Sequence, residues 1–343
     1  MKIEVQHEAV FGSCWDLGGI RKALDGARHI VLVGHQNADG DAVGSVLGMW
    51  HLLRQACKAE VMPLLPDGVP VDLDWLPSAD AILGGDDCRC TEAIDEADLV
   101  VFLDLNTIDR TGRLAEKLRA AKSRRLLVDH HEAPETCSFE TVVSEPELSS
   151  TCELVYWLMS RAYGDGIFTA DAATCLYTGI CTDTGTFSYS NDRPSVYLAA
   201  AALLHFGIDP MAINRQIKNV FTEERLRFFG HAMDTLLTVY PEQQVALMVI
   251  TAADMKAYDV ESADLTGLIN EVMKLRCIDC GILVREEEGR VRLSLRSKVR
   301  YDVNQLAGEL FAGGGHKRAA GATSLLPLQE TVDIVKQKLG LAK

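Results

Sequence analysis

The sequence predicts a two-domain α/β protein, with a parallel sheet in the first domain and a smaller α/β domain after a helical linker. The chain has 343 residues, which suits two domains of ordinary size. Short aliphatic or β-branched segments alternate with helical periodicity through residues 29–185, as in strands joined by crossover helices. Hydrophobic residues make up 48% of the chain and charged residues 24%, which is typical of a folded globular protein and not of a disordered or coiled-coil chain.

The expected elements follow in order along the chain. In the first domain, residues 1–190, we expect strands at 29–33, 98–104 and 125–129 and helices at 42–57 and 150–162. Residues 191–238 predict a stiff helical linker, because Pro194 suits a helix start and helical periodicity continues to about residue 240. In the second domain, residues 239–343, we expect strands at 244–251, 280–286 and 290–297 and helices at 262–276, 302–311 and 328–339.

The charge balance limits the classes of partner. The formal net charge is −15, and the sequence has no block of consecutive basic residues. Long duplex nucleic acid is therefore disfavoured, because phosphate neutralisation supplies most of the affinity for it, whereas small anionic substrates remain compatible with a local basic pocket. Without an apolar stretch of membrane-spanning length or an N-terminal signal core, and with its ten Cys scattered, the sequence predicts a cytoplasmic protein with no membrane partner.

Polar residues directly follow apolar segments at four places in the first domain. These residues are His35, Asp39 and Asp41 in the first cluster, Asp104 in the second, Asp129, His130 and His131 in the third, and Asp183 in the fourth. Taken alone, each cluster also has an ordinary structural interpretation, such as a helix cap or a solvated strand end. Because ligands collect at the carboxyl ends of parallel strands, the accumulation of four Asp and two His favours a two-metal site.

The charges of this set agree with such a site. If the carboxylates of residues 39, 41, 104 and 183 converge, they repel one another or take up protons unless cations offset their charge. Two divalent ions supply the required +4. The mixture of imidazole and carboxylate ligands suits Mn²⁺, Co²⁺, Fe²⁺ or Zn²⁺, with Mn²⁺ favoured by the many oxygen ligands and Mg²⁺ a poorer fit.

The Asp129-His130-His131 triplet resembles the signature of the DHH phosphoesterase superfamily, and the other three clusters match its remaining motifs in order and spacing. One departure is Ala38, where related sequences often carry Pro. The resemblance implies hydrolysis of a phosphate ester, with His131 and Asp129 as catalytic residues. It also implies two metal positions that share Asp104, one formed with His35 and Asp39 and the other with Asp41, His130 and Asp183.

The second domain carries a glycine-rich segment, Gly313-Gly314-Gly315-His316-Lys317-Arg318, whose backbone N–H groups and cations suit an anion. Arg296-Ser297-Lys298 ends an expected strand and is a second candidate for phosphate contact, or simply a solvated basic strand end. Together they resemble the DHHA1 domain. The resemblance implies substrate-binding roles for Arg110, Arg296, Ser297, Asn304, Gly314, Gly315, His316 and Arg318.

The pairing of the two domains resembles the family of bifunctional oligoribonucleases and 3′-phosphoadenosine 5′-phosphate (pAp) phosphatases. The implied substrates are short single-stranded RNA or DNA oligonucleotides, dinucleotides and pAp, and the family allows a homodimer. Other interpretations are an inorganic pyrophosphatase or exopolyphosphatase, a RecJ-type exonuclease, a phosphodiesterase of linear dinucleotides and a non-catalytic nucleotide-binding protein. The glycine-rich segment argues against the first, and the absence of a basic stretch argues against the second.

Overall fold

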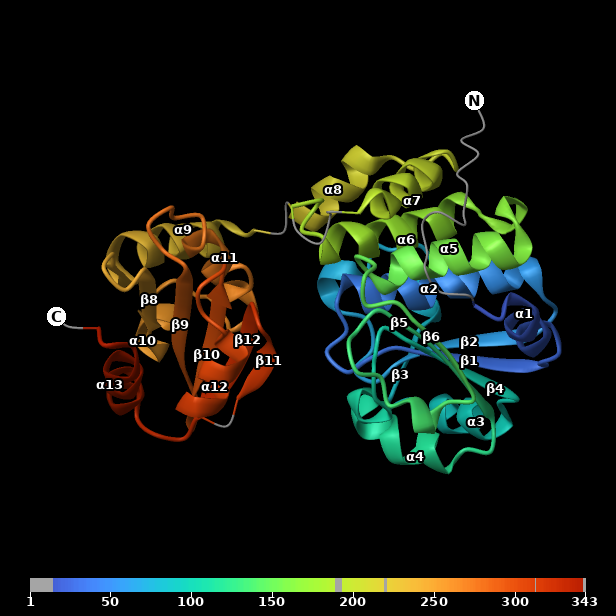
Figure 1. The fold of residues 1–343 in the computed structure, drawn as a ribbon, viewed down its shortest axis with the longest axis horizontal. Helices are drawn as coiled ribbons and strands as arrows, with labels where there is room; N and C mark the ends of the chain where they lie inside the picture. The colour runs from blue at the N-terminus through green and yellow to red at the C-terminus, as the bar shows by residue number, and fades with distance from the viewer. Residues whose placement is uncertain (1–14, 189–192, 219–220, 312, 342–343) are drawn as a thin grey trace. The chain divides into compact units, whose positions relative to one another are not determined.

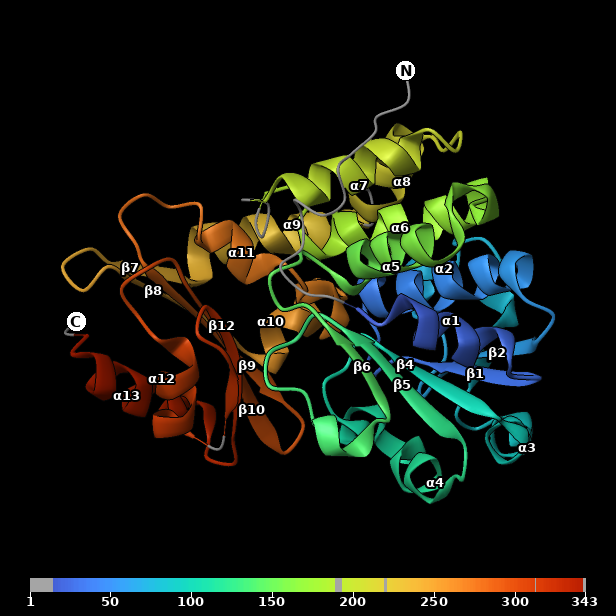
Figure 2. The same ribbon diagram turned by 45° about the vertical axis from the view of Figure 1, so that its right-hand side comes forward.

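The computed structural model describes residues 15–188, 193–218, 221–311 and 313–341, with only the backbone of His316, and it divides into two compact units (Figures 1 and 2). Unit 1 spans Met1–Val220 and unit 2 spans Phe221–Lys343. The segment 191–238, predicted as a linker, is divided between them. Its first two helices pack on unit 1 and its third helix packs in the core of unit 2.

Unit 1 contains a six-stranded sheet in which every described pairing is parallel, as predicted. Its strands are β1 (His29–Val33), β2 (Glu60–Leu65), β3 (Leu83–Gly84), β4 (Leu99–Leu103), β5 (Arg124–Asp129) and β6 (Thr141–Ser144). The strand order is β3-β2-β1-β4-β5-β6, so the chain winds outward in opposite directions from β1 and β4. The carboxyl ends of these two neighbouring strands lie at the point where sheets of this kind bind ligands.

Helices cover both faces of this sheet (Figure 1). One face carries α1 (Leu17–Asp25), α2 (Gly40–Ala56), α5 (Thr151–Tyr163), α6 (Ala170–Asp183), α7 (Pro194–Leu204) and α8 (Pro210–Lys218), and the other carries α3 (Cys88–Glu96) and α4 (Ala115–Ala120). Thirteen of the seventeen residues of α2 are buried. A Cβ at Gly44 would lie 2.6 Å from the carbonyl oxygen of Cys175, so glycine there lets α2 and α6 pack closely. The start of α2 also lies beside the end of α6, so close that a Cβ at Gly40 would collide with the Thr182 side chain.

Unit 2 contains a second six-stranded sheet, of mixed direction. Its strands are β7 (Leu237–Tyr240), β8 (Val245–Ile250), β9 (Cys280–Glu287), β10 (Arg290–Ser297), β11 (Gly314–His316) and β12 (Ala319–Ser324). The order is β11-β12-β10-β9-β8-β7, and β8 and β9 form the one parallel pair described in it. Its helices are α9 (Glu223–His231), α10 (Ala252–Ala257), α11 (Leu268–Val272), α12 (Val303–Leu310) and α13 (Leu328–Leu339).

Two sequence predictions for unit 2 are wrong in detail. Residues 237–240, expected to be helical, form β7, because Leu-Thr-Val-Tyr is a good strand sequence and pairs antiparallel with β8. The helix expected at 262–276 is broken by Gly267, whose φ of 86° is left-handed, and only a 3₁₀ turn and the short α11 form there. In the part of the chain that the structure describes, no helix combines the length and the apolar character needed to cross a bilayer.

Candidate metal centre

Six side chains singled out by the sequence lie together at the carboxyl edge of the unit 1 sheet. They come from five places, and each is set by the end of an element. His35 follows β1, Asp104 follows β4 and His130 follows β5, while Asp39 caps the start of α2, Asp41 lies in its first turn and Asp183 ends α6. They form groups whose ligand atoms all lie within 4.8 Å of one another.

The first group is His35, Asp39 and Asp104. His35 Nε2 lies 3.4 Å from Asp104 Oδ2 and 3.8 Å from Asp39 Oδ1. Its other ring nitrogen, Nδ1, lies 2.8 Å from the carbonyl oxygen of Gln36, which fixes the proton there. Nε2 is buried and has no hydrogen-bond partner among the described residues. This nitrogen therefore faces two carboxylates and is the ring atom available to a cation, as in a metal-ligating histidine.

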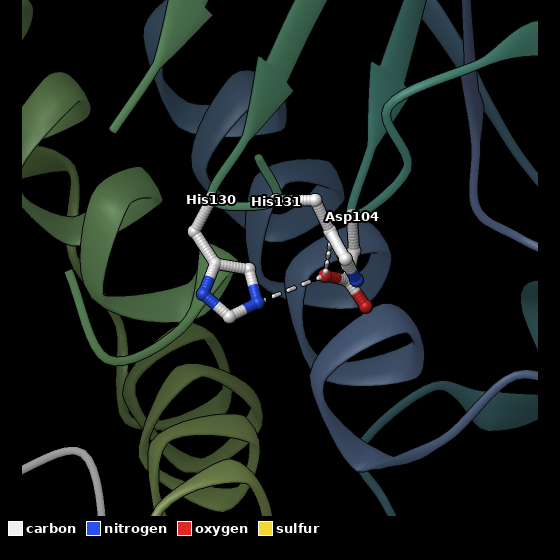
Figure 3. A group of neighbouring side chains, drawn as sticks. All are labelled: Asp104, His130 and His131. Carbon is white, nitrogen blue, oxygen red and sulfur yellow. Dashed lines mark ion pairs between the residues drawn. The ribbon is translucent and has the colours of Figure 1, made fainter. Parts of the chain in front are cut away.

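The second group is Asp41, His130 and Asp183. His130 Nε2 lies 3.4 Å from Asp183 Oδ2 and 3.8 Å from Asp41 Oδ2. The same nitrogen lies 3.6 Å from Asp104 Oδ1 (Figure 3). Asp104 therefore faces the first group with Oδ2 and the second with Oδ1, and its carboxylate can serve as a ligand in both.

The pKa values in this cluster reflect uncompensated negative charge. Burial, together with the charges of neighbouring carboxylates, raises the pKa of Asp41 well above its usual range. Burial raises the pKa of Asp183 to about 7, and the charge of His130 only partly opposes it. Burial disfavours the charged form of His35, but the adjacent carboxylates of Asp104 and Asp39 outweigh it and raise the pKa of His35 to about 10. Without cations, the cluster therefore binds protons that offset part of its negative charge. Its oxygen and imidazole donors are ligands that divalent ions accept.

His131 forms a third group with Asp104 and His130 and is held from both sides. Its Nδ1 lies 2.7 Å from Oδ1 of Asp129, and its backbone N–H donates to Oδ2 of the same carboxylate at 3.1 Å. Arg110 Nη1 lies 3.0 Å from His131 Nε2, so the guanidinium donates to this nitrogen. Asp129 is fully buried and fixes the orientation of the ring.

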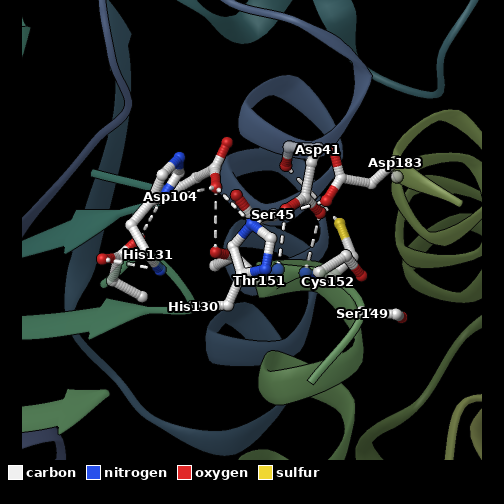
Figure 4. A network of polar contacts seen from close by, with 12 residues as sticks. Asp41, Ser45, Asp104, His130, His131, Ser149, Thr151, Cys152 and Asp183 are labelled. Atoms are coloured by element: carbon white, nitrogen blue, oxygen red, sulfur yellow. Dashed lines mark hydrogen bonds and ion pairs between the residues drawn. The ribbon is translucent and has the colours of Figure 1, made fainter. Parts of the chain in front are cut away.

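The start of α5 also contacts the cluster, which the sequence interpretation missed (Figure 4). The backbone N–H groups of Thr151 and Cys152 donate to the two carboxylate oxygens of Asp41, and the Thr151 hydroxyl donates to Asp104 Oδ1. The sequence does carry a feature that marks the start of this helix. Ser150 and Glu153 have the spacing of a capping box before an apolar run, which marks a helix N-terminus.

The candidate substrate residues of unit 2 gather around the end of β10 and the β11–β12 hairpin. The Ser297 N–H donates to the Arg318 carbonyl at 3.0 Å, and Asn304 Oδ1 accepts from the Gly315 N–H at 2.9 Å. Gly314 lies in β11, and Arg296 pairs with Ala319 of β12. The His316 side chain lies outside what the structure describes. Arg110, the remaining candidate, lies in unit 1 against His131.

The loop that follows β10 is held by a carboxylate that the sequence interpretation did not single out. Asp279 accepts hydrogen bonds from the backbone N–H groups of Val299, Arg300 and Tyr301 at 2.8, 2.7 and 3.1 Å. Arg318 Nη1 donates to the carbonyls of Val299 and Tyr301 in the same loop. Asp279 is buried, and through these hydrogen bonds it holds a loop whose cationic residues Lys298 and Arg300 are exposed.

Comparisons with known proteins agree with this architecture. The model of the DHH family, N-terminal domain, matches residues 29–180, and the DHHA1 domain model matches residues 243–340. A crystal structure of an exopolyphosphatase-related protein from Bacteroides fragilis is 32% identical and superposes with a TM-score of 0.91, covering 94% of this chain and 95% of that one.

Two curated relatives match over nearly their full length. A probable bifunctional oligoribonuclease and PAP phosphatase NrnA from Streptococcus mutans is 25% identical over 92% of this chain and 95% of its own. The bifunctional oligoribonuclease and PAP phosphatase NrnA of Thermus thermophilus is 27% identical over 89% of this chain and 86% of its own. With both family models and a relative of 32% identity along nearly the whole chain, this protein belongs to the DHH/DHHA1 phosphoesterase family.

Proposed function

We propose that this protein is a two-metal hydrolase that releases mononucleotides from an end of short oligonucleotides, including nanoRNA and dinucleotides, and dephosphorylates pAp to AMP. The observation that carries the proposal is the position of Asp104. One of its carboxylate oxygens faces His35 and the other faces His130, which suits a ligand shared by two cations.

The proposed metal ligands follow from the two groups. His35, Asp39 and Asp104 would hold one ion, and Asp41, Asp104, His130 and Asp183 would hold the other. Mn²⁺ suits this mixture of oxygen and imidazole donors best, with Co²⁺, Fe²⁺, Zn²⁺ and Mg²⁺ as alternatives. When bound, such a pair of ions lowers the pKa of water and offsets charge on phosphoryl oxygens.

The chain's own side chains orient the phosphate. Asp129 holds the Nδ1 proton of His131, which leaves Nε2 to face the reacting group. Arg110 donates to this Nε2 in the structure, so a phosphate that draws the guanidinium toward itself also changes what Nε2 contacts. We assign phosphate binding to Arg110 and contact with the scissile phosphate or the leaving oxygen to His131.

A nucleotide substrate is supported by unit 2 and by the relatives. Residues 243–340 carry thirteen Lys or Arg and thirteen Asp or Glu, so this region is neutral within a chain of net charge −15. Five of these cations, at positions 296, 298, 300, 317 and 318, come from the end of β10, the loop after it and the turn between β11 and β12, and they suit the phosphates of a short oligonucleotide. The curated relatives are named for both proposed activities.

The cysteines are compatible with the cytoplasm, where we propose that the enzyme acts. Nine Cys are free in the described part of the chain, and five of them are buried. Free thiols persist in a reducing compartment.

An exopolyphosphatase is the second candidate function. It is favoured by the name of the 32%-identical relative from Bacteroides fragilis. The same metal centre would serve it, and only the leaving group would differ.

One substrate panel separates the two. The purified full chain is incubated with Mn²⁺ and either 5′-phosphorylated di- and trinucleotide RNA, a much longer RNA, pAp, polyphosphate or pyrophosphate, with EDTA in parallel. We expect mononucleotides chiefly from the shortest RNAs, phosphate from pAp and no product with EDTA. Hydrolysis of polyphosphate or pyrophosphate alone would replace the proposal with the second candidate, and no hydrolysis of any substrate would indicate a non-catalytic binding protein.

A further inference from the structure

Thr151 contacts two of the proposed metal ligands and is not itself one of them. It is the first residue of α5 and is fully buried. Its backbone N–H donates to Asp41 Oδ2 at 2.6 Å, and its hydroxyl donates to Asp104 Oδ1 at 3.0 Å (Figure 4). One residue therefore connects two carboxylates that come from α2 and from the end of β4.

The two oxygens that Thr151 contacts lie on the same side of the cluster. Each is the oxygen of its carboxylate that faces His130 Nε2, at 3.8 Å for Asp41 Oδ2 and 3.6 Å for Asp104 Oδ1. Asp104 Oδ2, which faces His35, is not the oxygen that accepts from Thr151. The hydrogen bonds of Thr151 thus act on the position formed with His130 and not on the position formed with His35.

Asp104 needs such a contact because its backbone alone does not fix the carboxylate. The residue has a left-handed φ of 60°, so the chain turns sharply as it leaves β4. Its carboxylate can rotate about the side-chain bonds unless a partner holds one oxygen. The Thr151 hydroxyl supplies that partner and assigns Oδ1 to the His130 side.

The start of α5 is itself fixed by hydrogen bonds that need no cation. Ser150 Oγ accepts from the Glu153 N–H at 3.0 Å. The buried Glu153 carboxylate accepts from both the N–H and the hydroxyl of Ser149, at 2.9 and 2.7 Å. Thr151 is therefore held in place before any ion binds, and the contact is preorganised.

We propose that Thr151 is a positioning residue that sets the affinity of the metal position formed by Asp41, Asp104, His130 and Asp183, and leaves the position on the His35 side nearly unchanged. This inference rests on the proposed two-metal function. In this proposal, the Thr151 hydroxyl orients the shared Asp104 carboxylate, and the fold of α5 alone does not.

The test is a Mn²⁺ titration of the full chain, with free Mn²⁺ followed by electron paramagnetic resonance. Thr151→Val keeps the shape and the backbone N–H but removes the hydroxyl. We expect the wild-type chain to bind two ions and Thr151→Val to bind one with unchanged affinity and the other about 10- to 100-fold more weakly. Thr151→Ser, which keeps a hydroxyl, should restore much of the second affinity.

Thr178→Val is the matched control, because Thr178 is also buried in unit 1 but donates to the Thr174 carbonyl within α6. It should bind two ions like the wild type. Equal weakening of both positions in Thr151→Val, an unchanged second affinity, or a Thr151→Ser variant no better than Thr151→Val would overturn the inference. A wild-type chain that binds no Mn²⁺ would instead refute the proposed function on which the inference rests.

Discussion

The two units treat their buried carboxylates in opposite ways. In unit 2, Asp279 has three backbone N–H donors within 3.1 Å, and the region around it is neutral overall. In unit 1, Asp41 also accepts two backbone N–H groups, but three further carboxylates lie near it and its pKa rises well above the usual range. Internal hydrogen bonds compensate the charge of Asp279 in unit 2. They do not compensate the charge of the four carboxylates in unit 1.

This difference separates a structural carboxylate from a functional cluster. A buried charge that the fold itself satisfies serves to organise the chain, as Asp279 organises the loop after β10. Buried charges that the fold leaves uncompensated are costly, and they persist where a ligand supplies the missing charge.

The largest effect is expected from Asp104→Asn. The amide keeps the shape of the side chain but removes the negative charge that both metal positions share, so hydrolysis should fall by at least about 10³-fold. Asp95→Asn is the control, because Asp95 is an exposed residue of α3 paired with Lys117. Initial rates on the best substrate of the panel give the comparison. Activity above a tenth of the wild type in Asp104→Asn would refute a shared ligand.

A smaller effect, on stability and not on metal, is expected from Asp279→Ala. The substitution leaves three backbone N–H groups without their acceptor, which should lower the free energy of unfolding of unit 2 by roughly 2–4 kcal/mol. Urea denaturation of the variant, compared with Asp333→Ala at an exposed site in α13, measures it. Mn²⁺ affinity should not change. A loss of Mn²⁺ binding, or a stability equal to that of the control, would contradict the contrast between the units.

The smallest effect is a dependence of metal binding on pH. Asp41 and Asp183 have raised pKa values, so the metal-free folded chain binds protons more tightly than the unfolded chain and becomes less stable as pH rises from about 4 toward 7. Metal ions displace these protons, and Mn²⁺ affinity should therefore increase by about tenfold or more per pH unit between pH 5 and 7. Calorimetric titrations at several pH values measure the slope. A flat profile would mean that the cluster holds no protons to displace.

The sequence predicts the arrangement of the site better than the details that hold it. The rule that polar residues after parallel strands converge places His35, Asp104 and His130 together, because the strand pattern of unit 1 is regular. The contacts of Thr151 and Asp279 are hydrogen bonds between segments that no local pattern connects. Asp279 stands between an exposed Cys277 and a buried Cys280, and no sequence motif marks it.

The fold shows the same limit. The sequence predicts the apolar strands β1, β4 and β5, but not β2, β3, β6, β11 or β12. The sequence of β11 contains glycines that favour no strand, and its pairing with β12 stabilises it. Tertiary pairing, and not local preference, decides these segments.

The most direct measurement is anomalous diffraction at the manganese edge from crystals of the full chain grown with Mn²⁺. We expect two peaks per chain, roughly 3.5–4 Å apart, with one oxygen of Asp104 coordinated to each ion. Two ions on opposite sides of Asp104 would establish the centre on which the proposed hydrolysis depends. A single peak, or peaks that leave Asp104 without a metal, would contradict it.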